Sequence, residues 1–76
     1  YEQYGITPDI LTMAKPMANG LPMGAVLVTE AVGSAMQPGD HGTTFGGGPL
    51  VAHVANHVFD RISAPEMLAH VRTVGE

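Results

Sequence analysis

Residues 10–29, ILTMAKPMANGLPMGAVLVT, decide the fold that this sequence predicts. The run 10–14 is short, apolar and bounded by turn residues, which is typical of a buried strand. Residues 25–29 form a second apolar, β-branched run without polar alternation, as strands covered on both faces have. Between the two runs, Pro16, Pro22 and the Asn19-Gly20 pair interrupt regular structure. We therefore expect a strand, a loop and a second strand.

Helices are expected after these strands. Residues 30–36 predict a short helix with Thr29 as its N-cap. Residues 49–62 predict the longest helix, because apolar side chains recur every four residues along it and Pro49 suits a first helical position. Apolar strands with helices to cover them indicate part of an α/β layered fold.

A last helix is predicted from its start signal. Ser63 and Glu66 have the spacing of a capping box, in which each side chain bonds a free N–H group of the first turn. Apolar residues at 67, 68, 71 and 74 then supply one apolar side.

The composition narrows the class of protein. The chain has 76 residues and a formal net charge of −4, with three basic residues and no cysteine. Nucleic-acid binding needs clustered cations, which are absent, and disulfide or thiolate chemistry needs cysteine. Charged residues make up 13%, about half the usual ~25% share. We therefore expect a soluble, intracellular protein. We also expect this chain to be a piece from the interior of that protein and not a complete domain.

Lys15, the single lysine of the chain, ends the first apolar run and precedes Pro16. Burial favours the neutral form of a lysine amine, and a neutral amine can attack carbonyl groups and form Schiff bases. Alternatively, Lys15 extends to water from a strand end and has no chemical role. The position of Lys15 alone leaves both interpretations open and gives more weight to the second.

A second candidate is the stretch HGTTFGGGP at residues 41–49. Its glycines let the backbone approach a ligand, and the helix that follows offers free N–H groups to a phosphate. Thr43 or Thr44 can add a hydroxyl donor. The stretch is not a P-loop, because no Gly-Lys-Ser/Thr sequence follows the glycines. A flexible loop before a well-capped helix explains the pattern equally well.

The histidines are weaker candidates. His53 and His57 lie four residues apart on the predicted helix 49–62, a spacing that can hold zinc. No third ligand is evident, and both fall on the polar side with Asn56 and Asp60. We therefore expect a solvated or interface surface there and no metal site.

Two stretches together, TPDILTMAKPMANGLPMGAVLVTE at 7–30 and GDHGTTFGGGPLVAHVA at 39–55, resemble the class III, ornithine-type aminotransferases. These are pyridoxal-phosphate enzymes of fold type I. Within the family, the two stretches are most similar to the acetylornithine enzymes. The resemblance implies that the chain is part of the large, cofactor-binding domain of such an enzyme.

The resemblance also implies roles for particular residues. Lys15 matches the lysine that carries pyridoxal phosphate as a Schiff base and moves a proton between the substrate α-carbon and the cofactor. Thr44 matches a threonine that binds the cofactor phosphate of the partner subunit, and Thr43 matches a position beside the substrate. Gly46 and Gly47 match glycines that let the loop close over the cofactor.

Activity and partners follow from the same resemblance. It implies amino transfer from N-acetylornithine, or a related ω-amino donor, to 2-oxoglutarate in arginine biosynthesis, by a homodimer in the cytoplasm or, in a eukaryote, the mitochondrion. The family more often has asparagine where Gly48 stands, and its pyridine-nitrogen aspartate, ring-stacking residue and carboxylate-binding arginines lie outside this stretch. We therefore expect these residues alone to be inactive. The alternatives are an ornithine- or 4-aminobutyrate-type enzyme, an inactive truncated product, and a small phosphate-binding module.

Overall fold

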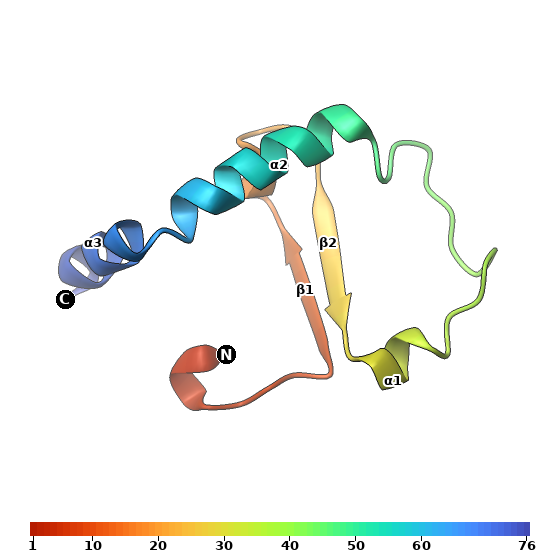
Figure 1. Cartoon of the computed structure of the whole chain (residues 1–76), viewed down its shortest axis with the longest axis horizontal. Coiled ribbons are helices and arrows are strands. Elements are labelled where there is room, and N and C mark those ends of the chain that lie inside the picture. The colour runs from red at the N-terminus through yellow and green to blue at the C-terminus, as the bar shows by residue number, and fades with distance from the viewer.

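A computed structural model describes residues 1–76. A short 3-10 helix, η1, leads into two strands joined by a second 3-10 helix, and three α-helices follow (Figure 1). The elements are η1 (Glu2–Tyr4), β1 (Ile10–Ala14), η2 (Pro16–Ala18), β2 (Gly24–Val28), α1 (Glu30–Gly33), α2 (Pro49–Ile62) and α3 (Pro65–Gly75). No helix among them is both long and apolar enough to span a bilayer.

The two predicted strands form an antiparallel hairpin. Ile10 lies opposite Val28, and the pairing runs to Ala14 opposite Gly24. The first strand has the predicted bounds, whereas the second lies one residue earlier than predicted, at Gly24–Val28. It ends there because Thr29 caps α1: the Thr29 hydroxyl accepts a hydrogen bond from the Val32 N–H at 3.3 Å.

The longest helix, α2, has the bounds that the sequence predicts and begins at Pro49. The capping box predicted for α3 is wrong. Ser63 closes α2 instead, since its N–H donates to the Phe59 carbonyl at 2.9 Å. Proline favours the first helical position, so α3 begins at Pro65 with Ala64 as its N-cap. Glu66 is therefore the second residue of the helix and not the third, as a capping box requires.

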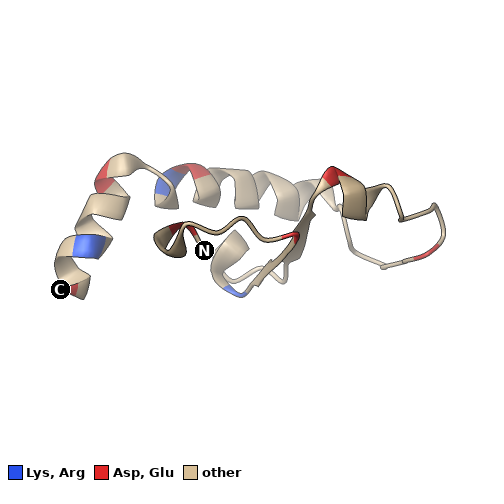
Figure 2. Ribbon diagram, turned by 90° about the horizontal axis from the view of Figure 1, so that it is seen from below, with Lys and Arg blue, Asp and Glu red and all other residues tan.

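The chain is flat and encloses little. It measures 45 × 31 × 15 Å, and Figure 2 shows α2 as a single layer over the hairpin. Its radius of gyration is 15.1 Å, against about 11 Å for a compact domain of this length. Only Ala18 and Ala55 are buried. The expected burial of the strands is absent in this chain: Ile10 is 56% and Val26 64% exposed, because α2 crosses only one end of the hairpin (Figure 1).

Candidate active site

Lys15 stands where β1 ends and η2 begins. Its backbone angles are φ 70° and ψ −102°, a conformation that residues with a side chain rarely adopt. Pro16 makes it more unusual, because a following proline pushes a residue toward extended angles with negative φ. Such a conformation costs on the order of 1–3 kcal/mol and is concentrated at functional sites. The side chain itself is exposed in this chain, so the burial considered from the sequence is not found.

The glycine loop has internal hydrogen bonds of its own. The Thr43 hydroxyl accepts from the Gly46 N–H at 3.2 Å, and the Gly48 N–H donates to the Phe45 carbonyl at 3.3 Å. Gly47 has φ +74°, which a glycine adopts without strain. A side chain at position 46 would collide with the side chain of Thr43. Glycine is therefore needed at both positions for this loop shape.

An open groove of about 420 Å³ lies between this loop and the start of β2. The polar groups that line the groove belong to Thr43 and the loop backbone, and its apolar lining includes Met23 and Val51. Thr43 therefore faces the groove, as a residue beside a substrate would. Thr44 is exposed and is not among the residues that line the groove.

The N-terminus of α2 leaves backbone donors free. Gly48 is the N-cap and contributes no side chain, and Pro49 has no N–H group. The first internal bond runs from the Ala52 N–H to the Gly48 carbonyl at 3.1 Å, so the N–H groups of Leu50 and Val51 have no carbonyl partner within the helix. Free N–H groups and the helix dipole suit an anionic group such as a phosphate.

The structure does not bring all the candidate residues together. The turn between β1 and β2, which includes Lys15, lies behind the middle of α2, whereas the loop between α1 and α2 bows outward beyond β2 (Figure 1). Lys15 is not among the residues that line the groove at the glycine loop. Pro22 and Met23 of the same turn do border the groove, so the turn reaches the glycine loop at that end.

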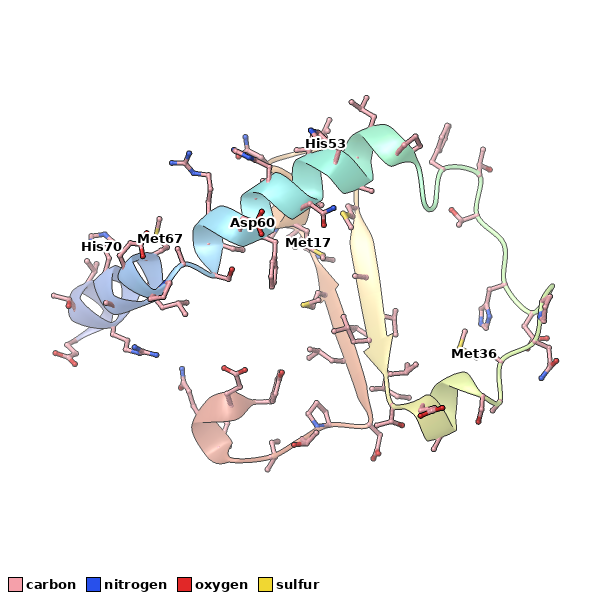
Figure 3. The ribbon with its side chains drawn as sticks, in the orientation of Figure 1. Met17, Met36, His53, Asp60, Met67 and His70 are labelled. Carbon is pink, nitrogen blue, oxygen red and sulfur yellow. The ribbon has the colours of Figure 1, made fainter.

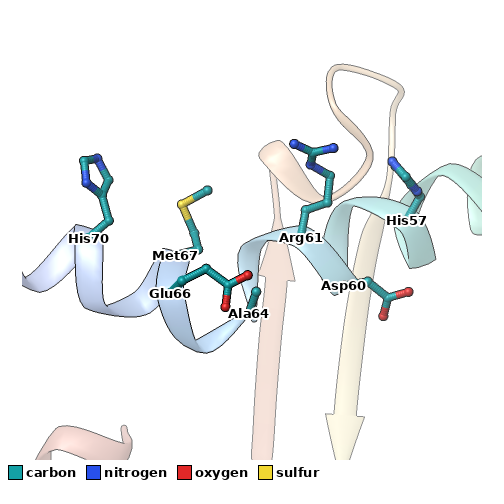
Figure 4. Close-up of a pocket in the computed structure, with 7 residues that line it drawn as sticks. All are labelled: His57, Asp60, Arg61, Ala64, Glu66, Met67 and His70. Carbon is teal, nitrogen blue, oxygen red and sulfur yellow. The ribbon is translucent and has the colours of Figure 1, made fainter.

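The histidines lie apart from both regions. His53 is exposed on α2 and His70 on α3 (Figure 3). His57, Arg61 and His70 border a separate hollow of about 480 Å³ at the junction of α2 and α3. The side chains of His57 and Arg61 point to one side of α2 there, and that of Asp60 points to the other (Figure 4). The chain has no group of three side chains placed to hold a metal ion.

A family model described as aminotransferase class-III matches residues 1–76, the whole chain. The chain belongs to this family. A probable mitochondrial acetylornithine aminotransferase of Dictyostelium discoideum is 61% identical over 69 residues, which are 91% of this chain and 15% of that protein. The acetylornithine aminotransferase of Neisseria meningitidis serogroup B is 53% identical over 76 residues, all of this chain and 19% of that protein.

A relative named for another substrate is about as similar to this chain as the Neisseria relative. The succinylornithine transaminase of Salmonella paratyphi B is 54% identical over 72 residues, 95% of this chain and 18% of that protein. The chain thus spans between about a seventh and a fifth of the length of these relatives. The resemblance to class III, ornithine-type aminotransferases is confirmed, and the family implies fold type I.

Proposed function

We propose that this chain is the lysine-bearing segment of a pyridoxal-phosphate-dependent aminotransferase that moves an amino group from N-acetylornithine to 2-oxoglutarate. The observation that carries the proposal is the strained backbone of Lys15 at the end of a hairpin in a chain matched over its whole length by one aminotransferase family. The acetylornithine aminotransferases among the relatives supply the donor.

The residues present fit such a cofactor. Lys15 offers an exposed amine for a covalent carbon–nitrogen linkage to the cofactor aldehyde, and the start of α2 offers two free N–H groups to a phosphate. When bound, the cofactor supplies the electron sink of the reaction. Lys15 then takes and returns the proton at the substrate carbon that bears the transferred amine, as a general base and acid. Thr44 binds phosphate, and Thr43 lies beside the substrate.

The proposal extends to architecture. The hairpin, α1, α2 and α3 form part of the large cofactor-binding domain of a fold type I enzyme, and the enzyme is a homodimer. Thr44 serves the cofactor of the partner subunit. One observation supports this arrangement: many apolar side chains of the chain are left exposed.

One alternative donor has a specific observation in its favour. The succinylornithine relative is as similar to this chain as the Neisseria acetylornithine relative. The two donors differ only in the acyl group on the α-nitrogen, at the other end of the molecule from the side-chain amine that is transferred. The donor is therefore determined by comparing the activity of the full-length protein with each candidate.

The central test is to find where the cofactor is attached. The full-length protein, loaded with pyridoxal phosphate, is reduced with borohydride, and the labelled peptide is located by mass spectrometry. We expect the label on Lys15 in the wild type, and neither label nor the cofactor's visible absorbance band in Lys15→Ala. Lys15→Arg is the matched control, because it keeps the charge but cannot form the linkage.

Activity is then compared with N-acetylornithine, N-succinylornithine, ornithine and 4-aminobutyrate as donors, with glutamate formation from 2-oxoglutarate as the readout. A label on a different lysine, or an absorbance band that persists in Lys15→Ala, would show that Lys15 is not the attachment residue. A labelled Lys15 with preference for another donor would overturn only the choice of substrate.

A further inference from the structure

The backbone of Lys15 needs support from its surroundings. A positive φ in a residue with a side chain persists only where neighbouring structure enforces it. Before Lys15, the ladder between β1 and β2 holds the chain up to Ala14, which pairs with Gly24. After Lys15, η2 has only three residues and no side-chain cap, so it cannot hold the turn by itself. The support on that side has to come from another element.

That element is α2, on which η2 packs. The two buried residues of the chain are divided between these elements: Ala18 of η2 is 0% exposed and Ala55 of α2 is 8% exposed. Met17 is half-buried, and Figure 3 shows it beneath α2. Everything else in the chain has more solvent access, so this small contact is its most enclosed point.

The small side chains of Ala18 and Ala55 affect the distance between η2 and α2. Alanine lets two backbones approach closely, and closely packed sites have no room for further methyl groups. Two methyl groups added at position 18 or 55 would push η2 away from α2. Because Lys15 directly precedes η2, such a shift would change the angles at Lys15 and the direction of its amine.

We propose that Ala18 and Ala55 are positioning residues whose contact holds the Lys15 backbone in its strained conformation and aims the amine at the cofactor aldehyde. The inference rests on the proposed role of Lys15. In the step concerned, the amine nitrogen adds to the aldehyde carbon, a carbon–nitrogen bond forms and water leaves, so no oxidant or reductant is needed. Neither alanine touches the reacting atoms.

The test compares two cofactor forms in the full-length protein. Pyridoxal phosphate binds through the Lys15 linkage as well as through noncovalent contacts, whereas pyridoxamine phosphate lacks the aldehyde and binds through noncovalent contacts alone. The variants are Ala18→Val and Ala55→Val. The controls are Ala31→Val and Ala69→Val, since Ala31 and Ala69 are exposed alanines in α1 and α3.

We expect the ratio of pyridoxal phosphate affinity to pyridoxamine phosphate affinity to fall about tenfold in both variants, equivalent to about 1.4 kcal/mol. In the controls the ratio should stay within about twofold, as for most surface substitutions. A loss of affinity for both cofactor forms by the same factor would overturn the inference, because it would show a structural role without an effect on the amine.

The inference would also be overturned if the ratio of the two cofactor affinities stayed at the wild-type value in folded Ala18→Val and Ala55→Val. If these variants do not fold, Ala18→Gly and Ala55→Gly are measured in their place. They loosen the packing of η2 on α2 without overpacking it, and they should also lower the ratio of pyridoxal phosphate affinity to pyridoxamine phosphate affinity. Borohydride labelling of the wild type separates this inference from the proposed function: a label on another lysine refutes the role of Lys15 before any alanine is changed.

Discussion

Thr43 and Thr44 are neighbours, but their hydroxyl groups have different surroundings. The Thr43 hydroxyl is engaged inside the loop, where it accepts from the Gly46 N–H, and its side chain lines the groove. Thr44 is exposed and does not line the groove. Of the two, Thr44 is therefore the residue available to a phosphate held by another subunit.

Removing the Thr44 hydroxyl should weaken cofactor binding. For Thr44→Ala we expect the binding free energy of pyridoxal phosphate to fall by about 1–3 kcal/mol, as for a hydrogen bond to a charged group. Thr44→Ser, which keeps the hydroxyl, should retain most of the affinity. Equilibrium dialysis of the full-length protein measures both, and equal affinity in Thr44→Ala and the wild type would contradict the role.

For Lys15, the sequence predicts a candidate residue but not its backbone conformation. Its place at the end of an apolar run before Pro16 singles it out as a candidate. The same proline, however, predicts extended angles with negative φ, and the structure has φ 70°. We attribute this departure from the local preference to the packing of η2 on α2, and the two buried alanines of these elements have no chemical signature in the sequence.

At the scale of elements, the glycine loop offers a matched pair of substitutions. Gly47 has φ +74°, whereas Gly42 lies outside the left-handed region and has open space where a side chain would go. Gly47→Ala should destabilise the loop by about 1–2 kcal/mol, the cost of a left-handed conformation for a residue with a side chain. Gly42→Ala should be neutral or stabilise by about 0.4–1 kcal/mol.

Both effects can be measured as changes in the urea midpoint of the full-length protein and in its affinity for pyridoxamine phosphate. Gly47→Ala should lower the affinity more than Gly42→Ala, because the loop would then hold its N–H groups in the wrong place. Equal effects from the two substitutions would mean that the shape of this loop does not matter for the cofactor.

Local signals predict most of the elements well. Apolar spacing and Pro49 predict the bounds of α2, and Thr29 caps α1 as its residue type suggests. The capping box at Ser63 fails because a second signal, Pro65, competes with it and fixes the helix start one residue later. Strand burial could not be predicted from strand composition, since burial depends on structure that lies against the hairpin.

At the scale of the whole molecule, the chain exposes most of the apolar side chains that its sequence patterns predicted to be inside. Leu50 on α2 is 72% exposed, and Val74 on α3 is 70% exposed. Its charges do not gather into a binding surface either: the three basic residues lie in separate places, at the end of β1, on α2 and on α3 (Figure 2). The sequence therefore singles out Lys15 and Thr44 as candidate residues, but it does not predict that both lie outside the lining of the groove at the glycine loop.

The role proposed for Thr44 leads to a prediction about subunits. Lys15→Ala and Thr44→Ala forms of the full-length protein are prepared separately, mixed in equal amounts and allowed to exchange subunits. If Thr44 serves the partner's cofactor, a mixed dimer has one site with both changes and one site with neither. About one quarter of all sites in a fully exchanged mixture should then be intact, because half of the dimers are mixed.

The readout is tight cofactor retention together with glutamate formation, compared with each parent form before exchange. Were Lys15 and Thr44 to serve the same cofactor from one chain, each site of a mixed dimer would carry one defect, and exchange would restore nothing. A sample that contains only Lys15→Ala is taken through the same mixing and exchange steps as a control for effects of the procedure itself. Recovery above both parents thus distinguishes a site shared between two chains, which the proposed function predicts, from a site closed within one.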